Sequence, residues 1–275
     1  MKIWEALIYG LVAGLTGLLP VSFSGHAAVL QDAFALSPLT QGGGLYVRAA
    51  ITLGLSAALV LAFPGELQLT CGELARCPQR GKRARQPSPR RRAVLMGLLA
   101  LPIGLLSLIW CAAAERITRL SLIAAFFCLN GLILFAAGRP GGQKDARALM
   151  LPDALLAGAT RLAAVLPGLS PLGLTLAVCR LRDLRTDFAL RFTAMLTLGF
   201  SLCEFVYRLL RAVIVGTFSA SLWLPMLVAL VASTVAGYFA LQYLKYLLHR
   251  EKLRVFSYYC WDAAVIALIL ALINA

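Results

Sequence analysis

The stretch Gly17–His26, GLLPVSFSGH, interrupts an otherwise apolar N-terminus. Proline breaks a helix and glycine weakens it, so an apolar run that holds both is read as a broken helix and not as a continuous one. Two serines and one of the chain's two histidines lie in the same ten residues. What such a break can do depends on the solvent that surrounds it.

Composition places the chain in a membrane. Of its 275 residues, 60% are hydrophobic and 14% are charged, and the mean hydropathy is +0.83; a soluble domain is about 45–50% apolar and about 25% charged. Apolar runs near the length that crosses about 30 Å of hydrocarbon recur, without the alternation of a β-barrel. We predict an all-α integral membrane protein with six spanning helices, at Leu45–Phe63, Ala93–Ala114, Leu120–Ala137, Phe188–Phe205, Leu222–Tyr246 and Val255–Ile273.

The net charge of +14 orients these spans. Eight basic residues fall in 75–92, ARCPQRGKRARQPSPRRR, within a predicted loop at about 64–92. Lysine and arginine mark cytoplasmic loops and attract anionic membrane lipids, so nucleic acid is not expected as a partner. With this loop inside, eighteen basic residues lie on the cytoplasmic face and four lie outside, namely Arg116, Arg119, Arg208 and Arg211.

This charge balance requires two interrupted segments, Ile3–Ala35 and Leu151–Val178, each to enter and leave the membrane by the same face. They contain similar sequences, GLVAGLTGLLPVSFSG at 10–25 and GATRLAAVLPGLSPLG at 158–173. Broken apolar segments in matching places of two halves indicate an inverted-topology repeat with a central site. The pattern predicts two re-entrant helix pairs, with two merely kinked helices as the alternative.

The predicted halves share one membrane core. They cover about 1–137 and 150–275, so we predict a single membrane domain over 1–275. Seven cysteines show no paired spacing of the kind that zinc sites have, and no metal ligands are predicted from them.

Broken helices can bind an anion, because the N-terminus of a half-helix offers unpaired amides and a positive dipole end. Ser22, Ser24, Ser170 and Thr175 add hydroxyl groups near the two breaks. His26 can exchange a proton near neutral pH. A lipid with an anionic headgroup fits such a site, with its tail in the bilayer.

The motifs resemble those of a known family. GLTGLLPVSFSGH is similar to the first signature of the bacterial undecaprenyl-diphosphate phosphatases, approximately EGxTExLPVSSTGH, and LPGLSPLGLT is similar to the second, approximately PGxSRSGxT. The resemblance covers the whole chain. It implies a bacterial inner-membrane protein of the bacitracin-resistance type, which removes the terminal phosphate of an isoprenyl diphosphate lipid carrier in peptidoglycan synthesis. Mg²⁺ or Ca²⁺ is the cofactor expected if the chain is catalytic.

The resemblance also implies roles for matched residues. His26 and Ser22 would carry out proton transfer or attack. Arg161, six residues before Pro167, is a candidate charge partner that the family motif does not include. The expected substrate-binding residues are Thr16, Ser24, Gly25, Gly168, Ser170, Gly173 and Thr175.

Ser24 stands where the first signature has threonine, and five further positions depart more strongly. Ala13 and Gly17 stand where the family has glutamates, Phe23 where it has the second serine of a pair, and Pro171 and Leu172 where it has arginine and serine. Losing one strong donor to a developing anion costs about 10²–10³ in rate. The sequence therefore leaves three functions open: hydrolysis of an isoprenyl diphosphate, its binding or transport without hydrolysis, and a structural membrane subunit. A homodimer stays open beside a monomer.

Overall fold

The computed structural model describes residues 1–65, 72, 88–139 and 142–274, so most of the basic stretch 75–92 lies outside the described residues. Regular structure in these ranges is helical, apart from one isolated bridge between Lys144 and Leu184. The helices are α1 (Ile3–Gly17), α2 (Phe23–Phe34), α3 (Gly44–Ala62), α5 (Pro89–Leu105), α6 (Leu108–Ala114), α7 (Leu120–Ala137), α8 (Leu151–Ala164), α9 (Pro171–Leu181), α10 (Thr186–Val215), α11 (Trp223–His249) and α12 (Val255–Ile273).

The predicted all-α membrane architecture is confirmed. Four helices are long and apolar enough to cross a bilayer: α3, α7, α12, and α11 with the short turn before it. The pair α5 and α6, bent by 45°, meets the same test when taken together. α10 covers the remaining predicted span but does not meet this test; it has 30 residues and runs past the predicted end at Phe205 to Val215.

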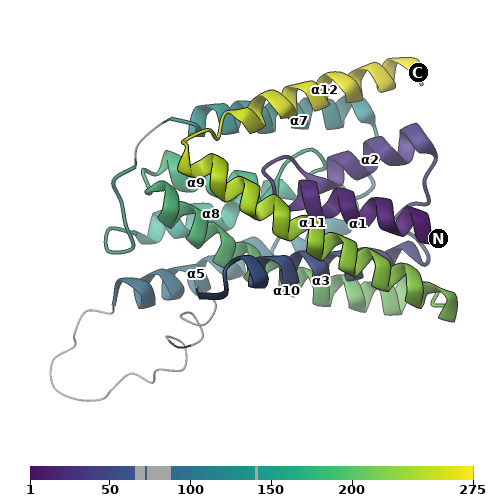
Figure 1. The fold of residues 1–275 in the computed structure, drawn as a ribbon, viewed down its shortest axis with the longest axis horizontal. Helices are drawn as coiled ribbons and strands as arrows, with labels where there is room; N and C mark the ends of the chain where they lie inside the picture. The colour runs from purple at the N-terminus through teal and green to yellow at the C-terminus, as the bar shows by residue number, and fades with distance from the viewer. Residues whose placement is uncertain (66–71, 73–87, 140–141, 275) are drawn as a thin grey trace.

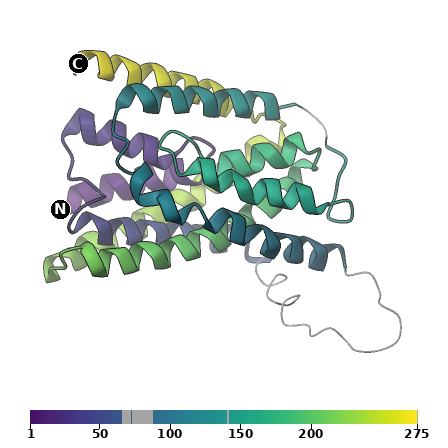
Figure 2. The same ribbon diagram turned by 180° about the vertical axis from the view of Figure 1, so that it is seen from behind.

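The two interrupted segments form two helical hairpins, as predicted for re-entrant pairs. α1 has 15 residues, about 22 Å of helix at 1.5 Å per residue, which is too short to cross the hydrocarbon. Figures 1 and 2 show α1 and α2 running back to the end of the bundle that carries the N-terminus, and α8 and α9 running to the opposite end. The tips of the hairpins therefore face each other inside the bundle.

Helices of one half pack against helices of the other half in matching pairs, as expected for an inverted repeat. α1 packs against α11 and α8 packs against α5, so that each hairpin leans on a long helix of the other half. The pairs α3–α11 and α10–α5 are related in the same way, and α3–α10 and α7–α12 each join equivalent helices. The two halves interleave, and the junction of the hairpin tips lies where they cross.

Hydrogen bonds close the junction of the two tips. Ser22, the N-cap of α2, accepts the N–H of Gly25 at 3.4 Å and the N–H of Gly168 at 3.2 Å through its Oγ. Ser170, the N-cap of α9, accepts the N–H of Gly173 at 3.0 Å and donates its own hydroxyl to the carbonyl of Leu19 at 3.2 Å. Each capping serine thus satisfies its own helix and also binds the opposite tip.

Glycine is required where the tips touch. Gly168 has a φ of +105°, and a methyl group there would lie 2.9 Å from the carbonyl oxygen of Ile123. A methyl group on Gly25 would lie 2.9 Å from the Cα of Gly168. The backbones of the two motifs approach each other more closely than any side chain allows.

Asn130 of α7 bridges the two tips from the side. Its amide nitrogen donates to the carbonyl of Pro20 at 3.0 Å, and its amide oxygen accepts the N–H of Ser170 at 3.0 Å. The side chain is fully buried. Because the broken backbone has no helical partner at these points and water is absent from the hydrocarbon, one amide satisfies one orphan group on each hairpin.

Replacing Asn130 by leucine should destabilise the fold by about 1–3 kcal/mol, because the buried N–H of Ser170 loses its partner and the carbonyl of Pro20 keeps only the weak thiol donor of Cys260. We expect a lower midpoint of thermal unfolding for the purified protein in detergent. Ser257→Ala is the control, since the buried Ser257 hydroxyl has no hydrogen-bond partner among the described residues and its loss should leave the midpoint unchanged. Equal midpoints for both variants would contradict the bridging role of Asn130.

Candidate functional site

A cavity lies beside the tip junction, among α1, α2, α3, α6, α8, α9 and α10; we call it the central cavity. Leu18, Ile51 and Leu55 give it an apolar part, and Gly17, Phe23 and Pro171 come from the two motifs. Its polar lining residues are Ser24, Arg48, Thr52, Ser107, Cys111, Glu115, Arg161, Thr197, Ser201, Glu204 and Arg208.

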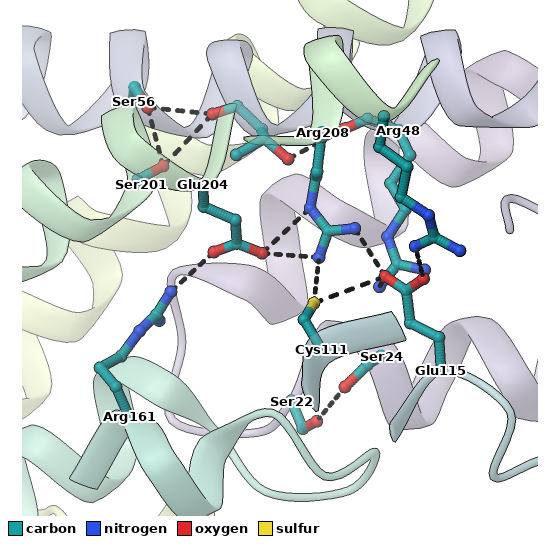
Figure 3. A network of polar contacts seen from close by, with 12 residues as sticks. Ser22, Ser24, Arg48, Ser56, Cys111, Glu115, Arg161, Ser201, Glu204 and Arg208 are labelled. Carbon is teal, nitrogen blue, oxygen red and sulfur yellow. Dashed lines mark hydrogen bonds and ion pairs between the residues drawn. The ribbon is translucent and has the colours of Figure 1, made fainter. Parts of the chain in front are cut away.

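Five charged side chains from four helical segments converge on this cavity (Figure 3). Glu204 of α10 is bound on both carboxylate oxygens: one accepts from Arg208 at 2.6 and 3.0 Å, and the other accepts from Arg161 of α8 at 2.6 Å. The Arg161 guanidinium also lies 5.2 Å from the centre of the Phe200 ring. Arg161 therefore reaches the central cavity from the second hairpin, as the sequence suggested.

Glu115, directly after α6, gathers three arginines. Its Oε1 lies 2.8 Å from Arg208 and 3.2 Å from Arg48 of α3, and its Oε2 is bound by Arg211. Arg208 links this group to Glu204, so one continuous network joins α3, α6, α8 and α10. Four arginines and two glutamates leave the network with a net charge of +2.

Burying such a network costs free energy, so its presence inside the bundle indicates a role beyond packing. Arg208 is 8% exposed and lies inside the helix bundle on α10. Charges inside membranes are paired, and they mark ligand or ion pathways more often than they stabilise the fold. An excess of guanidinium groups, which bind phosphate and carboxylate with paired N–H donors, makes the central cavity a candidate anion site.

A second cavity continues from the central one, and both walls include Phe23, Ser24, Arg48, Glu115 and Val165. Its remaining wall comes from α2, from residues 38–41, from residues 114–118 and from Pro167. Glu115, Arg48 and Ser24 thus stand where the two cavities join.

Comparison with known proteins supports the resemblance seen in the motifs. The family profile described as bacitracin resistance protein BacA matches residues 6–266. This chain belongs to the BacA family. A protein of Methanobrevibacter smithii named undecaprenyl-diphosphatase is 30% identical over 97% of this chain and 96% of its own length. One of the same name from Carboxydothermus hydrogenoformans is 31% identical over 98% of both chains.

Most of the motif residues predicted to bind substrate lie in the tip junction or inside their own helices. Ser24 and Arg161 line the central cavity. Thr16 donates to the carbonyl of Val12, and Thr175 donates to that of Pro171 and pairs with Thr160. Gly25, Gly168, Ser170 and Gly173 form the junction together with Ser22. In this chain, most BacA motif residues thus form the tip junction beside the central cavity. That they contact substrate stays a prediction.

His26 is held at the side of α2 that faces α12. Its Nδ1 lies 2.6 Å from the carbonyl oxygen of Ser22, which can only accept, so Nδ1 carries the proton. Nε2 then accepts from the hydroxyl of Tyr259, 2.9 Å away. The ring also stacks on Tyr259 and meets the edge of Phe127. Nδ1 is thus held within the first turn of α2, Nε2 joins α2 to α12, and His26 is not among the residues that line either cavity.

The departures from the BacA signatures have two different surroundings. Gly17, Phe23 and Pro171, three of the positions that depart from the expected signature pattern, line the central cavity. Ala13 and Leu172 are fully buried in the apolar core. The central cavity is therefore lined both by three of these residues and by the arginine network.

The structure corrects one expectation about charge. Arg208 and Arg211 were expected in an outer loop, but α10 continues through both, and Arg208 lies in the central cavity. The reason is that Glu204 and Glu115 neutralise them, so charged residues that normally end an apolar span are tolerated inside the helix. The sequence did not single out three residues that the structure places in these contacts: Glu115, Asn130 and Tyr259. Only Asn130 could have been noticed, as a lone asparagine within the apolar run 120–137.

The residues present do not fit a divalent cation. Mg²⁺ and Ca²⁺ take oxygen ligands, and both carboxylates of the cavity have arginine on each oxygen. Among the residues that the structure describes, no three His, Cys, Asp or Glu side chains are grouped so as to hold a metal ion.

A double-mutant cycle tests the link between His26 and Tyr259. Tyr259→Phe should lower the free energy of unfolding by about 1 kcal/mol through loss of one hydrogen bond. His26→Leu should make the tyrosine change nearly silent, because leucine offers no acceptor to the Tyr259 hydroxyl. Thermal or denaturant unfolding in detergent measures both, with the exposed Tyr258→Phe as the control. Additive effects of the two changes would contradict the link.

Proposed function

We propose that this BacA-family protein binds the diphosphate headgroup of an isoprenyl lipid in the central cavity. The observation that carries the proposal is the convergence of Arg48, Arg161 and Arg208, from three different helices, on a cavity that Ser24 of the first motif also lines. Diphosphate is a multiply charged anion whose two phosphate groups are tetrahedral, and a guanidinium group can donate two parallel N–H bonds to the oxygens of one phosphate. The relatives' name, undecaprenyl-diphosphatase, supports the same ligand class.

The site suits an amphiphile and not a freely soluble anion. The cavity lies at the level of the hairpin tips, inside helices whose outer faces carry apolar side chains such as Leu129, Val235 and Ile269. A headgroup in the cavity would leave its isoprenyl chain among lipid tails. The second cavity opens a route past α2 and residues 38–41, which in the proposed orientation, with the basic loops in the cytoplasm, leads to the outer face of the membrane.

Removal of the terminal phosphate is the second function that we propose, and a specific observation favours it. Ser24 holds a hydroxyl at the point where the two cavities join, bound to Ser22 at 3.3 Å, beside Arg48 and Glu115. In hydrolysis, a water oxygen forms a bond to the terminal phosphorus as the phosphoanhydride P–O bond breaks, giving isoprenyl monophosphate and inorganic phosphate. The arginines would stabilise the charge that spreads over the transferred group.

Arg48→Gln is the sharpest test of binding. Glu115 keeps Arg208 and Arg211 when Arg48 is lost, so no carboxylate is left unpaired and the fold should be retained. A lost charged hydrogen bond of about 1.5–3 kcal/mol predicts about 10- to 100-fold weaker binding of undecaprenyl diphosphate, measured by titration in detergent. Arg182→Gln removes an arginine that pairs with Asp153, away from the cavity, and should leave the affinity unchanged. Equal affinities for wild type and Arg48→Gln would contradict the proposed site.

Phosphate release from undecaprenyl diphosphate tests the second function. We expect release by the wild type that falls about 10²–10³-fold in Arg208→Gln, because one strong donor to the developing anion is lost. Release that is unaffected by Arg208→Gln would place the chemistry elsewhere. Tight binding with no release would leave a lipid-phosphate carrier or transporter as the function, and no binding at all would leave a structural subunit.

A further inference from the structure

The carboxylates of the central cavity are already saturated by cations of the chain itself. Glu204 accepts from the Nε and Nη2 of Arg208 on one oxygen and from Arg161 on the other. Glu115 accepts from Arg208 on one oxygen and from Arg211 on the other, with Arg48 at 3.2 Å. A divalent cation entering this network would have to replace guanidinium groups that repel it.

The same network supplies the charge that a divalent cation would bring. Four arginines and two glutamates leave a net +2, and the guanidinium groups come from α3, α8 and α10 to different sides of one cavity. Guanidinium forks bind phosphate oxygens directly and stay protonated at any pH at which the protein folds. The positions where the family signatures carry glutamates offer no replacement oxygens, because they are Ala13 and Gly17.

We infer that this protein binds its diphosphate headgroup without a divalent cation, the arginine network taking the place of Mg²⁺ or Ca²⁺, and that Glu115 competes with the phosphates for Arg48 and Arg208. The inference rests on the proposed function and specifies how that same site holds its ligand. Two expected effects on affinity are opposite to those expected for a site in which a metal ion bridges the protein and the diphosphate. Mg²⁺ in solution should not strengthen binding, because it neutralises the diphosphate that the arginines attract. Neutralising Glu115 should strengthen binding, because the phosphates gain the guanidinium groups that it holds.

The experiment compares affinities for farnesyl diphosphate, a short isoprenyl diphosphate, by titration of the full chain in detergent with EDTA or with excess Mg²⁺ or Ca²⁺. We expect equal or weaker binding in the divalent cations. Glu115→Gln, which keeps the size of the side chain and one acceptor oxygen, should bind about tenfold more tightly in both buffers. Should Glu115→Gln fail to fold, Glu204→Gln gives the same reading, because Glu204 holds Arg161 and Arg208 in the same way.

The outcomes separate the inference from the proposed function. Binding that is tenfold tighter with Mg²⁺ or Ca²⁺ than with EDTA, or that is weakened by Glu115→Gln in their presence, would overturn the metal-free site while leaving lipid binding in place. Binding in neither buffer would overturn both. Inorganic diphosphate, titrated in parallel, shows whether the headgroup alone suffices; equal affinity for it and for farnesyl diphosphate would assign the site to a free anion and overturn the lipid ligand.

Discussion

The contact between the tips of the two hairpins is the constraint on which the rest of this structure depends. Each tip exposes backbone groups that no helix satisfies, and the hydrocarbon offers no water to bind them. The two tips satisfy each other's groups. The Oγ of Ser22 accepts the N–H of Gly168, and the hydroxyl of Ser170 donates to the carbonyl of Leu19. The side chain of Asn130 bonds to both tips. Glycines at 25 and 168 are the condition for this contact, because any larger residue would hold the backbones apart.

Once the tips meet, the position of the central cavity follows. α8 and α9 bring Arg161 and Pro171 to one side of the junction, and α1 and α2 bring Gly17, Phe23 and Ser24 to the other. The long helices α3 and α10 then supply Arg48, Glu204 and Arg208. A motif can therefore be indispensable to a site while contributing few of its lining side chains. In this member of the BacA family, the retained motif residues mostly hold the junction, whereas Gly17, Phe23 and Pro171 line the cavity and Ala13 and Leu172 lie in the apolar core.

The charge network explains how α10 can be both a membrane helix and part of a polar site. Arg208 and Arg211 would each be expensive alone in hydrocarbon, but Glu115 and Glu204 neutralise them from within the bundle. The arginines outnumber the carboxylates, so the network keeps an attraction for anions after it has satisfied itself. In the proposed function, the contacts that hold the network together are also those for which phosphate would compete, and Glu115 takes part in them.

Composition and residue pattern alone predicted the membrane class, the two broken segments, the family and most of the spans, but not that α10 continues to Val215. These follow from composition and from Gly, Pro and Ser at fixed places in the chain, which act locally. The sequence also indicated that Arg161 could reach the site. Only the tertiary structure decided that Ser22 caps and joins the tips, that His26 is held by Tyr259, and that Arg48, Glu115 and Arg208 share one cavity with Ser24. Those contacts join residues far apart in the chain, and the pairing that keeps Arg208 inside a helix is invisible until α6 and α10 are packed together. Local pattern fixes where a helix breaks, but which charges meet at the break is a property of packing.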